Sequence, residues 1–264
     1  MQDPIPAQRP TLLVFTLGAE TEGRRRRLLP QALRDRETAL YRACLDEALT
    51  AGRACGFRLA VSAPRRALDE GREPDVTLRA QGEGGFGDRL AAAFDAAGPA
   101  PGAPVMVVGT DTPGLGADRL RRAAAALAHP TGPTGLTRSG RVVIGPSPDG
   151  GLYLLAADRP LGELLRRVPW RRRRTLAALT RELERAGLAV HLLPPLADLD
   201  HPADLDAWLA RRRSASAEAL DRLAAALGRL LAALRRPFVL PPAATPRPAV
   251  VPVRAGRAPP RRPL

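Results

Sequence analysis

The sequence contains no lysine and no asparagine, so all 41 of its Lys and Arg residues are arginines. Aromatic residues make up only 3% of the chain, which argues against the stacking platforms of single-strand nucleic-acid binders. No apolar run approaches the ~20 residues of a membrane-spanning helix, which argues against a membrane partner. The first ten residues, MQDPIPAQRP, lack a basic stretch followed by an apolar core. We therefore expect no signal peptide and a cytoplasmic protein.

Cysteine is also scarce, since the chain has only Cys44 and Cys55. Both fall in a segment that we predict to be one long helix over residues 30–56. At ~1.5 Å rise per residue they lie roughly 16 Å apart, which is too far for a disulfide bond. We interpret both as small buried apolar side chains.

The formal net charge of +14 is the feature that most resembles a nucleic-acid signal. However, abundant Ala, Gly and Pro beside the missing Lys and Asn indicate a compositional bias of the coding sequence. Much of the excess lies in arginine runs at 24–27, 171–174 and 211–213, and such runs are usually solvated faces. We therefore expect no nucleic-acid partner; the alternative, duplex binding, predicts steeply salt-dependent affinity.

Strand-like and helix-like segments alternate along most of the chain. Continuous apolar runs are typical of strands buried on both faces, and amphipathic stretches are typical of covering helices. We predict strands at 11–18, 57–64, 76–81, 105–108, 188–194 and two within 141–157. We predict helices at 30–56, 88–98, 116–128, 161–167, 173–187 and 202–212. This alternation predicts an α/β fold with three layers, a mostly parallel sheet covered by helices on both faces.

The composition changes after Arg213. We predict one α/β domain over residues 1–213, a further C-terminal helix over 214–236, and a disordered tail over 237–264. The tail has many prolines, five arginines and no acid, a composition that cannot bury a core. The added helix either docks on the domain or joins a second copy of the chain in a homodimer.

Four loops follow predicted strands, at 19–30, 81–90, 109–115 and 145–151. Ligands of parallel α/β sheets gather outside the carboxyl ends of the strands. In the third loop Asp111 follows a fully apolar strand, where a carboxylate is costly unless it meets solvent, a donor or a metal ion. It either caps the following turn or binds a ligand. The arginine run of the first loop is either a solvated helix start or a phosphate clamp.

The combination of these loops is more specific than any one of them. Acids at two strand ends, flexible glycines and a guanidinium cluster are the parts needed to hold a diphosphate with a divalent cation. Mg²⁺ takes oxygen ligands, usually one or two carboxylates plus substrate phosphates, and arginines bind the remaining phosphate charge bidentately. The glycine-rich loop at 81–90 matches neither the dinucleotide fingerprint nor a P-loop.

Four motifs follow one another in order: GTDTPGL from residue 109, GPSPDGGLYLL from 145, VPW from 168 and LADLDHPADL from 196. Together with QGEGGFGDRL from 81, this series resembles a bacterial family of glycosyltransferase-A-like proteins. Its members are labelled arsenosugar-biosynthesis-type glycosyltransferases and are similar to 2-phospholactate guanylyltransferase. The resemblance implies a nucleotide-diphospho-sugar transferase-like fold over roughly residues 11–210.

The resemblance also implies roles for individual residues. Asp111 and Asp149 would bind Mg²⁺ or Mn²⁺, and Asp149 and Asp200 would be the catalytic or acceptor-side acids. The implied nucleotide-binding residues are Gly23, Arg24, Arg26, Gly82, Gly84, Gly85, Thr110, Gly150 and Gly151.

The sequence departs from the family pattern in two of these motifs. In the first loop Arg26 stands where the family has a lysine, and Arg27 and Leu28 stand where it has Thr-Arg. In the fourth loop Leu152 stands where it has a tyrosine. The resemblance implies a metal-dependent transferase that uses a nucleotide-activated sugar and a small-molecule acceptor. One alternative is a nucleotidyltransferase that joins a nucleoside triphosphate to a small phosphorylated acceptor. Another is a degenerate, non-catalytic member that only binds nucleotide.

Overall fold

The computed structural model describes residues 9–128 and 140–213. Residues 129–139, the predicted C-terminal helix over 214–236 and the predicted tail over 237–264 lie outside the described residues. The proposed boundary at residue 213 therefore stays a prediction. In the described part of the chain, no helix has both the length and the apolar character needed to cross a membrane.

A seven-stranded sheet with the order β3-β2-β1-β4-β6-β5-β7 forms the middle layer. Its strands are β1 (Thr11–Phe15), β2 (Arg58–Ala63), β3 (Val76–Ala80), β4 (Val105–Val108), β5 (Arg141–Pro146), β6 (Leu152–Ala157) and β7 (Ala189–Leu192). Only β6 runs antiparallel to its neighbours, β4 and β5. It does so because a short turn joins it to β5, whereas parallel strands need a long crossover. The prediction of a mostly parallel sheet is confirmed.

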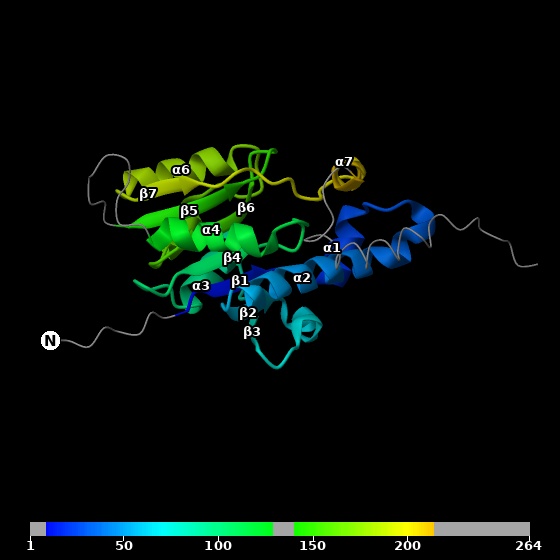
Figure 1. The fold of residues 1–264 in the computed structure, drawn as a ribbon, viewed down its shortest axis with the longest axis horizontal. Coiled ribbons are helices and arrows are strands. Elements are labelled where there is room, and N and C mark those ends of the chain that lie inside the picture. The colour runs from blue at the N-terminus through cyan, green and yellow to red at the C-terminus, as the bar shows by residue number, and fades with distance from the viewer. Residues whose placement is uncertain (1–8, 129–139, 214–264) are drawn as a thin grey trace, which may run out of the picture.

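Helices cover both faces of this sheet, as Figure 1 shows. The helical elements are α1 (Ala19–Arg26), η1 (Gln31–Arg36), α2 (Glu37–Ala54), η2 (Arg65–Gly71), α3 (Phe86–Ala96), α4 (Gly116–Ala128), α5 (Gly162–Arg167), α6 (Thr175–Arg185) and α7 (Pro202–Arg213). On one face α2 and α4 bury Leu49 and Leu120 against the sheet. On the other face α3 and α6 bury Phe94 and Leu179. The three-layer α/β/α architecture is thus confirmed.

Two local predictions near the N-terminus were wrong. The segment at 30–56 is not one helix, because a 3₁₀ turn precedes α2, which begins at Glu37. The buried Glu37 carboxylate accepts the backbone N–H of Leu29 at 2.7 Å and holds the chain bent there. Residues 19–26, predicted as a loop, form α1. It shows little apolar periodicity because its buried residues are only Ala19 and Gly23.

A third cluster of buried residues lies beyond the sheet and joins α7 to α1 and α2. Leu205 and Trp208 of α7 pack with Leu28, Leu40 and Tyr41. The chain that leaves the edge strand β7 must therefore cross the carboxyl ends of the strands to reach α1. This crossing carries residues 196–201 over the region where the sequence predicts a site. The two cysteines, Cys44 and Cys55, are free, as expected.

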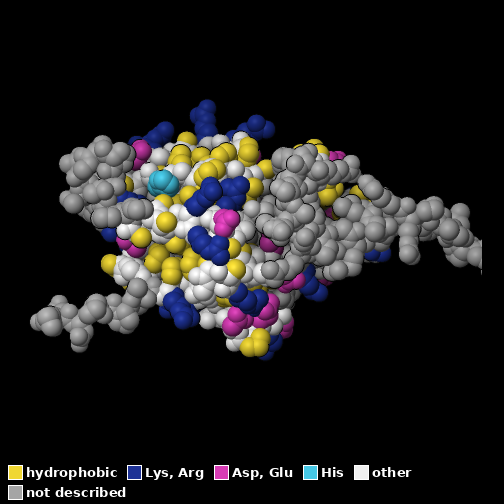
Figure 2. Space-filling view, in the orientation of Figure 1, with side chains coloured by type: hydrophobic (Ala, Val, Ile, Leu, Met, Phe, Trp, Pro, Cys, Tyr) yellow, Lys and Arg dark blue, Asp and Glu magenta, His cyan; other side chains and the backbone are white. Residues whose placement is uncertain are grey.

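The arginines do not form one continuous patch on the face shown in Figure 2. Their side chains lie in several separate groups among apolar and acidic side chains. Many of them pair with acids close by along the chain, as Arg121 does with Asp118 at 2.8 Å and Arg166 with Glu163 at 2.6 Å. Such exposed pairs are typical of solvated helix surfaces.

Candidate functional site

The neighbouring strands β1 and β4 are each followed by a threonine, Thr16 and Thr110, and the two side chains meet. The hydroxyl groups of Thr16 and Thr110 are buried and lie 3.0 Å apart. The Thr16 hydroxyl also accepts the N–H of Gly18 at 3.0 Å. The amide of Gln81 donates to the carbonyls of Thr16 and Ser62 at 2.8 and 2.9 Å, which ties the ends of β1 and β2 to the glycine-rich loop. The floor of the site is therefore fixed by hydrogen bonds.

Asp111, directly after this floor, binds an arginine. Arg26 at the end of α1 donates a 2.8 Å hydrogen bond to its carboxylate. The same guanidinium contacts Asp200, and its Nε lies 3.7 Å from the carboxylate of Glu22. Both side chains of the Arg26–Asp111 pair are only about a quarter exposed, at 25% and 26%. One guanidinium thus joins α1 to two of the loops that carry acids.

Asp149 lies in the tight turn between β5 and β6, and the glycines after it shape that turn. The Asp149 carboxylate accepts the N–H of Gly151 at 2.8 Å. Gly150 has a φ of 90°, and a Cβ at this position would run into the carbonyl oxygen of Arg173. The Gly150 carbonyl accepts the N–H of Leu176 at 2.9 Å. Only glycine fits this left-handed, tightly packed position.

The crossing segment before α7 adds two more carboxylates, on Asp198 and Asp200. Its backbone is fixed because the N–H of Leu199 donates to the carbonyl of Asp111 at 2.7 Å. One oxygen each of Asp149, Asp198 and Asp200 lies within 4.8 Å of the others. Burial, together with the charges of Asp111 and Asp149, raises the pKa of Asp198 to about 6. We call these three residues the carboxylate group; they line a cavity of about 290 Å³.

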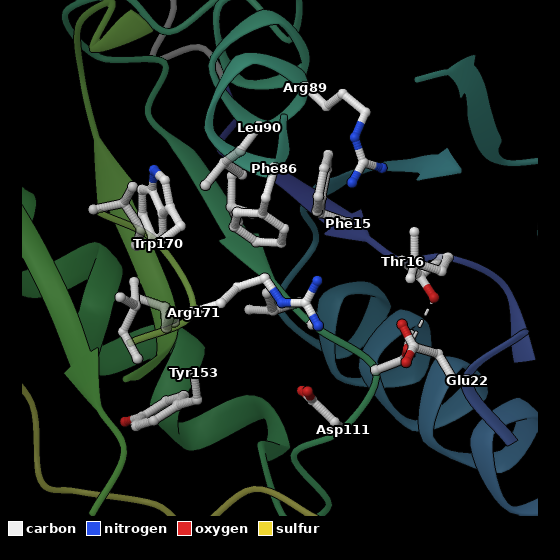
Figure 3. Close-up of a pocket in the computed structure, with 18 of the residues that line it drawn as sticks. Phe15, Thr16, Glu22, Phe86, Arg89, Leu90, Asp111, Tyr153, Trp170 and Arg171 are labelled. Atoms are coloured by element: carbon white, nitrogen blue, oxygen red, sulfur yellow. Dashed lines mark hydrogen bonds between the residues drawn. The ribbon is translucent and has the colours of Figure 1, made fainter. Parts of the chain in front are cut away.

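A second cavity, of about 180 Å³, opens beside Asp111 on the α3 side of the sheet. We call it the aromatic cavity, because Phe15, Phe86 and Trp170 line it. Figure 3 shows these rings on one side, Glu22 and Asp111 on the other, and the Arg171 side chain extending toward the centre. The remaining basic lining residues are Arg25, Arg26 and Arg89. The cavity thus combines an apolar wall with four guanidinium groups and the carboxylates of Glu22 and Asp111.

The predicted site residues divide between these two cavities and their surroundings. Arg26, Thr110 and Asp111 line the aromatic cavity, whereas Asp149 and Asp200 line the cavity of the carboxylate group. Gly150 and Gly151 form the turn that holds Asp149. The two acids expected to share a metal ion, Asp111 and Asp149, thus have different nearest partners: Arg26 for one, and two other carboxylates for the other.

The remaining predicted residues line neither cavity. Gly23 is buried, and a Cβ there would lie 3.1 Å from the backbone of α2. Arg24 is exposed and pairs with Glu20 at 2.8 Å. The glycines at 82, 84 and 85 lie in the exposed loop before α3. Among them, Gly85 donates its N–H to the Asp88 carboxylate at 3.0 Å, which caps the helix.

Several lining residues escaped sequence reasoning. Asp198 could have been found, because Asp198 and Asp200 alternate in an extended segment and so project to the same side. Trp170 of the VPW motif packs against α3 and also lines the aromatic cavity. Arg171 gave no signal, since it lies in a run of four arginines. Its φ of 62° singles it out only in the structure, because non-glycine residues rarely adopt left-handed backbone.

The chain has recognisable relatives in sequence and in structure. Residues 44–172 match the family described as "Uncharacterized protein conserved in bacteria (DUF2064)". No functionally curated protein matches the chain. Neither finding bears on the arsenosugar label.

Solved structures resemble the fold more fully. A candidate nucleotide-diphospho-sugar transferase from Desulfovibrio desulfuricans G20 matches with a TM-score of 0.69 and 20% identity, over 86% of this chain and 98% of that one. Rv0371c from Mycobacterium tuberculosis H37Rv matches with a TM-score of 0.45 and 18% identity, over 76% and 98% of the two chains. The first likeness, together with the sheet and helix layers described above, shows that the chain has a nucleotide-diphospho-sugar transferase-like fold.

Proposed function

We propose that the protein is a metal-dependent transferase that uses a nucleotide-activated sugar. The observation that carries the proposal is the convergence of the carboxylate group with Arg26 and Asp111 at the carboxyl ends of the strands, in a nucleotide-diphospho-sugar transferase-like fold. Ligands of open α/β sheets bind in this position. The resemblance of the sequence motifs supports the same reaction class.

The carboxylate group has the donors that a hard divalent cation prefers. Mg²⁺ and Mn²⁺ favour carboxylate oxygens, and three such oxygens converge here. The raised pKa of Asp198 reflects burial and crowding of like charges, which a cation would relieve. Asp149, Asp198 and Asp200 would hold the ion, with Asp111 beside them. When bound, such an ion neutralises the negative charge that develops on a departing diphosphate.

The chain's own cations would hold the phosphates. Arg25 and Arg26 lie at the end of α1 and line the cavity next to Asp111. Guanidinium groups bind phosphate oxygens bidentately. Thr110, on the same floor, offers a hydroxyl group. The exposed loop of Gly82, Gly84 and Gly85 would border the nucleotide, since glycine allows close approach of a ligand to the backbone.

A second candidate function is nucleotidyl transfer from a nucleoside triphosphate to a small phosphorylated acceptor. The observation that favours it is the number of guanidinium groups around one cavity, on Arg25, Arg26, Arg89 and Arg171. This supply exceeds what one diphosphate requires and would suit a triphosphate together with an acceptor phosphate. Pyrophosphate release with a panel of triphosphates separates the two functions.

The test of the leading proposal is a thermal-shift screen of nucleotide-sugars, each with and without Mn²⁺. A ligand present at 100 times its Kd adds about 2.7 kcal/mol to the free energy of unfolding, which is readily detected. We expect stabilisation by at least one nucleotide-sugar, and more of it with Mn²⁺ present. Stabilisation by nucleotide-sugars without any turnover would instead support the non-catalytic alternative.

A further inference from the structure

We propose that the aromatic cavity is the acceptor subsite, and that it takes a phosphate or carboxylate carried on an apolar ring. The inference rests on the proposed transferase function and names the acceptor class of that same site. Asp111 and Arg26, beside which the donor phosphates would lie, form one edge of the cavity, and Phe86, Arg89 and Leu90 of α3 line another part of it. It shares no lining residue with the cavity of the carboxylate group.

The volume of the cavity indicates whether it holds a whole nucleotide-sugar or a smaller ligand. Sites that hold a complete drug-sized ligand are typically ~300–1,000 Å³, whereas this cavity is about 180 Å³. A nucleotide-sugar is too large for it. One ring with its substituent fits, and such a ligand matches a small-molecule acceptor.

The aromatic side chains of the apolar wall can pack against a ring of the ligand. The rings of Phe15 and Phe86 lie 5.5 Å apart, edge to face, and those of Phe86 and Trp170 lie 5.4 Å apart. Aromatic rings prefer such offset or edge-on contacts at ~4.5–7 Å. Leu90 of α3 lines the same side. A flat or apolar ligand would replace water against this wall, which favours binding.

Trp170 is held rigidly in this wall. Its indole N–H donates to the carbonyl of Leu165 at 2.7 Å. Its ring packs on the first turn of α3 at Gly87, where a Cβ would come within 2.8 Å of the indole Cδ1. A side chain at residue 87 would therefore push the ring away. The wall is formed before any ligand binds, which reduces the entropy lost on binding.

Arg171 and Arg89 are the reason to expect that the ligand carries a negative charge. Arg171 makes no hydrogen bond or ion pair with residues 9–128 and 140–213, the part of the chain that the structure describes. Its φ is 62°, and its side chain extends toward the centre of the cavity in Figure 3. Strained backbone of this kind clusters at ligand sites. Arg89 donates one N–H to Gln81 at 2.5 Å, which fixes its guanidinium at the cavity wall. A guanidinium without a carboxylate partner selects an anion, and phosphate and carboxylate both match its geometry.

The experiment measures binding to the full chain by calorimetry, with no nucleotide and no metal. The probes are phenyl phosphate, benzoate, inorganic phosphate and benzyl alcohol. We expect phenyl phosphate or benzoate to bind about tenfold more tightly than either inorganic phosphate or benzyl alcohol, because only they engage the wall and the arginine together. Equal affinity of inorganic phosphate, or no binding of phenyl phosphate and benzoate at millimolar concentration, would overturn the proposal.

Single substitutions test whether phenyl phosphate binds in the aromatic cavity. Arg171→Gln should weaken phenyl phosphate about tenfold, whereas Arg174→Gln, an exposed arginine of the same run that does not line the cavity, should leave it unchanged. Phe86→Leu keeps an apolar side chain and should weaken the aromatic probe while leaving inorganic phosphate unaffected. Equal effects of Arg171→Gln and Arg174→Gln would contradict the assignment.

Competition separates this inference from the proposed function. If phenyl phosphate binds but no nucleotide-sugar does, the result would support the anion subsite and count against a nucleotide-sugar as the donor. Nucleotide-sugar and phenyl phosphate that bind together support both proposals. Nucleotide-sugar that displaces phenyl phosphate competitively shows that the cavity belongs to the donor, and this would overturn the acceptor assignment.

Discussion

Arg26 donates a 2.8 Å hydrogen bond to the carboxylate of Asp111, although the two residues are 85 positions apart in the chain. The same guanidinium contacts Asp200. Arg26 is thus a shared counter-ion for acids from two loops, and it links α1 to the ends of β4 and the crossing segment. A phosphate that binds at this point would meet an arginine that is already positioned.

Replacing this arginine should cost stability. Arg26→Gln leaves Asp111 without its cation in a setting where both side chains are about a quarter exposed, at 25% and 26%. We expect the free energy of unfolding to fall by about 1–3 kcal/mol, measured by urea denaturation. Arg24→Gln is the matched control, because Arg24 pairs with Glu20 on the exposed side of the same helix. Its loss should stay below about 0.5 kcal/mol, and equal losses for the two variants would contradict the role of Arg26.

Glu47 should make stability depend on pH. Burial raises its pKa from 4.5 to about 7, while the N–H of Gly114, which it accepts at 3.0 Å, opposes the rise. Below pH 4.5 the side chain is protonated in both the folded and the unfolded state, so its contribution to stability is fully present. As the pH rises toward 7 the unfolded state ionises first, and that contribution is lost, by roughly 3 kcal/mol.

Glu47→Gln should remove this loss. We expect the difference in free energy of unfolding between pH 4.5 and pH 7.5 to be smaller in the variant than in the parent protein, by denaturant titration at each pH. Glu83→Gln changes an exposed glutamate of the glycine-rich loop and serves as the control. If the free energy of unfolding changes equally with pH in the parent protein and in Glu47→Gln, burial does not raise the pKa of Glu47, and the prediction is contradicted.

Gly150 should tolerate no side chain. Gly150 and Gly187 both have positive φ, 90° and 75°, but a Cβ would collide with the Arg173 carbonyl at residue 150 and meet nothing within 4 Å at residue 187. Gly187→Ala should cost about 1–2 kcal/mol, from the left-handed backbone alone. Gly150→Ala should cost at least about 1 kcal/mol more, measured by thermal unfolding. Equal costs would show that the turn holding Asp149 is not tightly packed.

The sequence predicts the sheet well and the site in part. Apolar runs such as the one at 105–108 mark the buried strands, and the rule that ligands gather at their carboxyl ends selects the loops of Asp111 and Asp149. What it misses depends on tertiary contacts. α1 has almost no apolar periodicity, so its helical form depends on packing against α2. The contact between Arg26 and Asp111 joins residues that no local pattern links.

The same reason explains why Asp198 and Arg171 were missed. Asp198 reaches the site because α7 packs on α1 and α2, which pulls the preceding segment across the strand ends. Arg171 is indistinguishable by sequence from the three arginines after it. Its place at the cavity follows from the fixed ring of Trp170 and from its own left-handed backbone.

The most direct test of the account is a calorimetric titration of the protein with Mn²⁺, followed by the nucleotide-sugar that the screen selects. We expect Asp198→Asn to weaken Mn²⁺ binding at least about tenfold, because it removes one carboxylate from the group. Asp206→Asn, an exposed acid of α7, should leave Mn²⁺ binding unchanged. Mn²⁺ and nucleotide-sugar binding that is undiminished in Asp198→Asn and in Asp149→Asn would contradict the proposed metal-dependent transferase site.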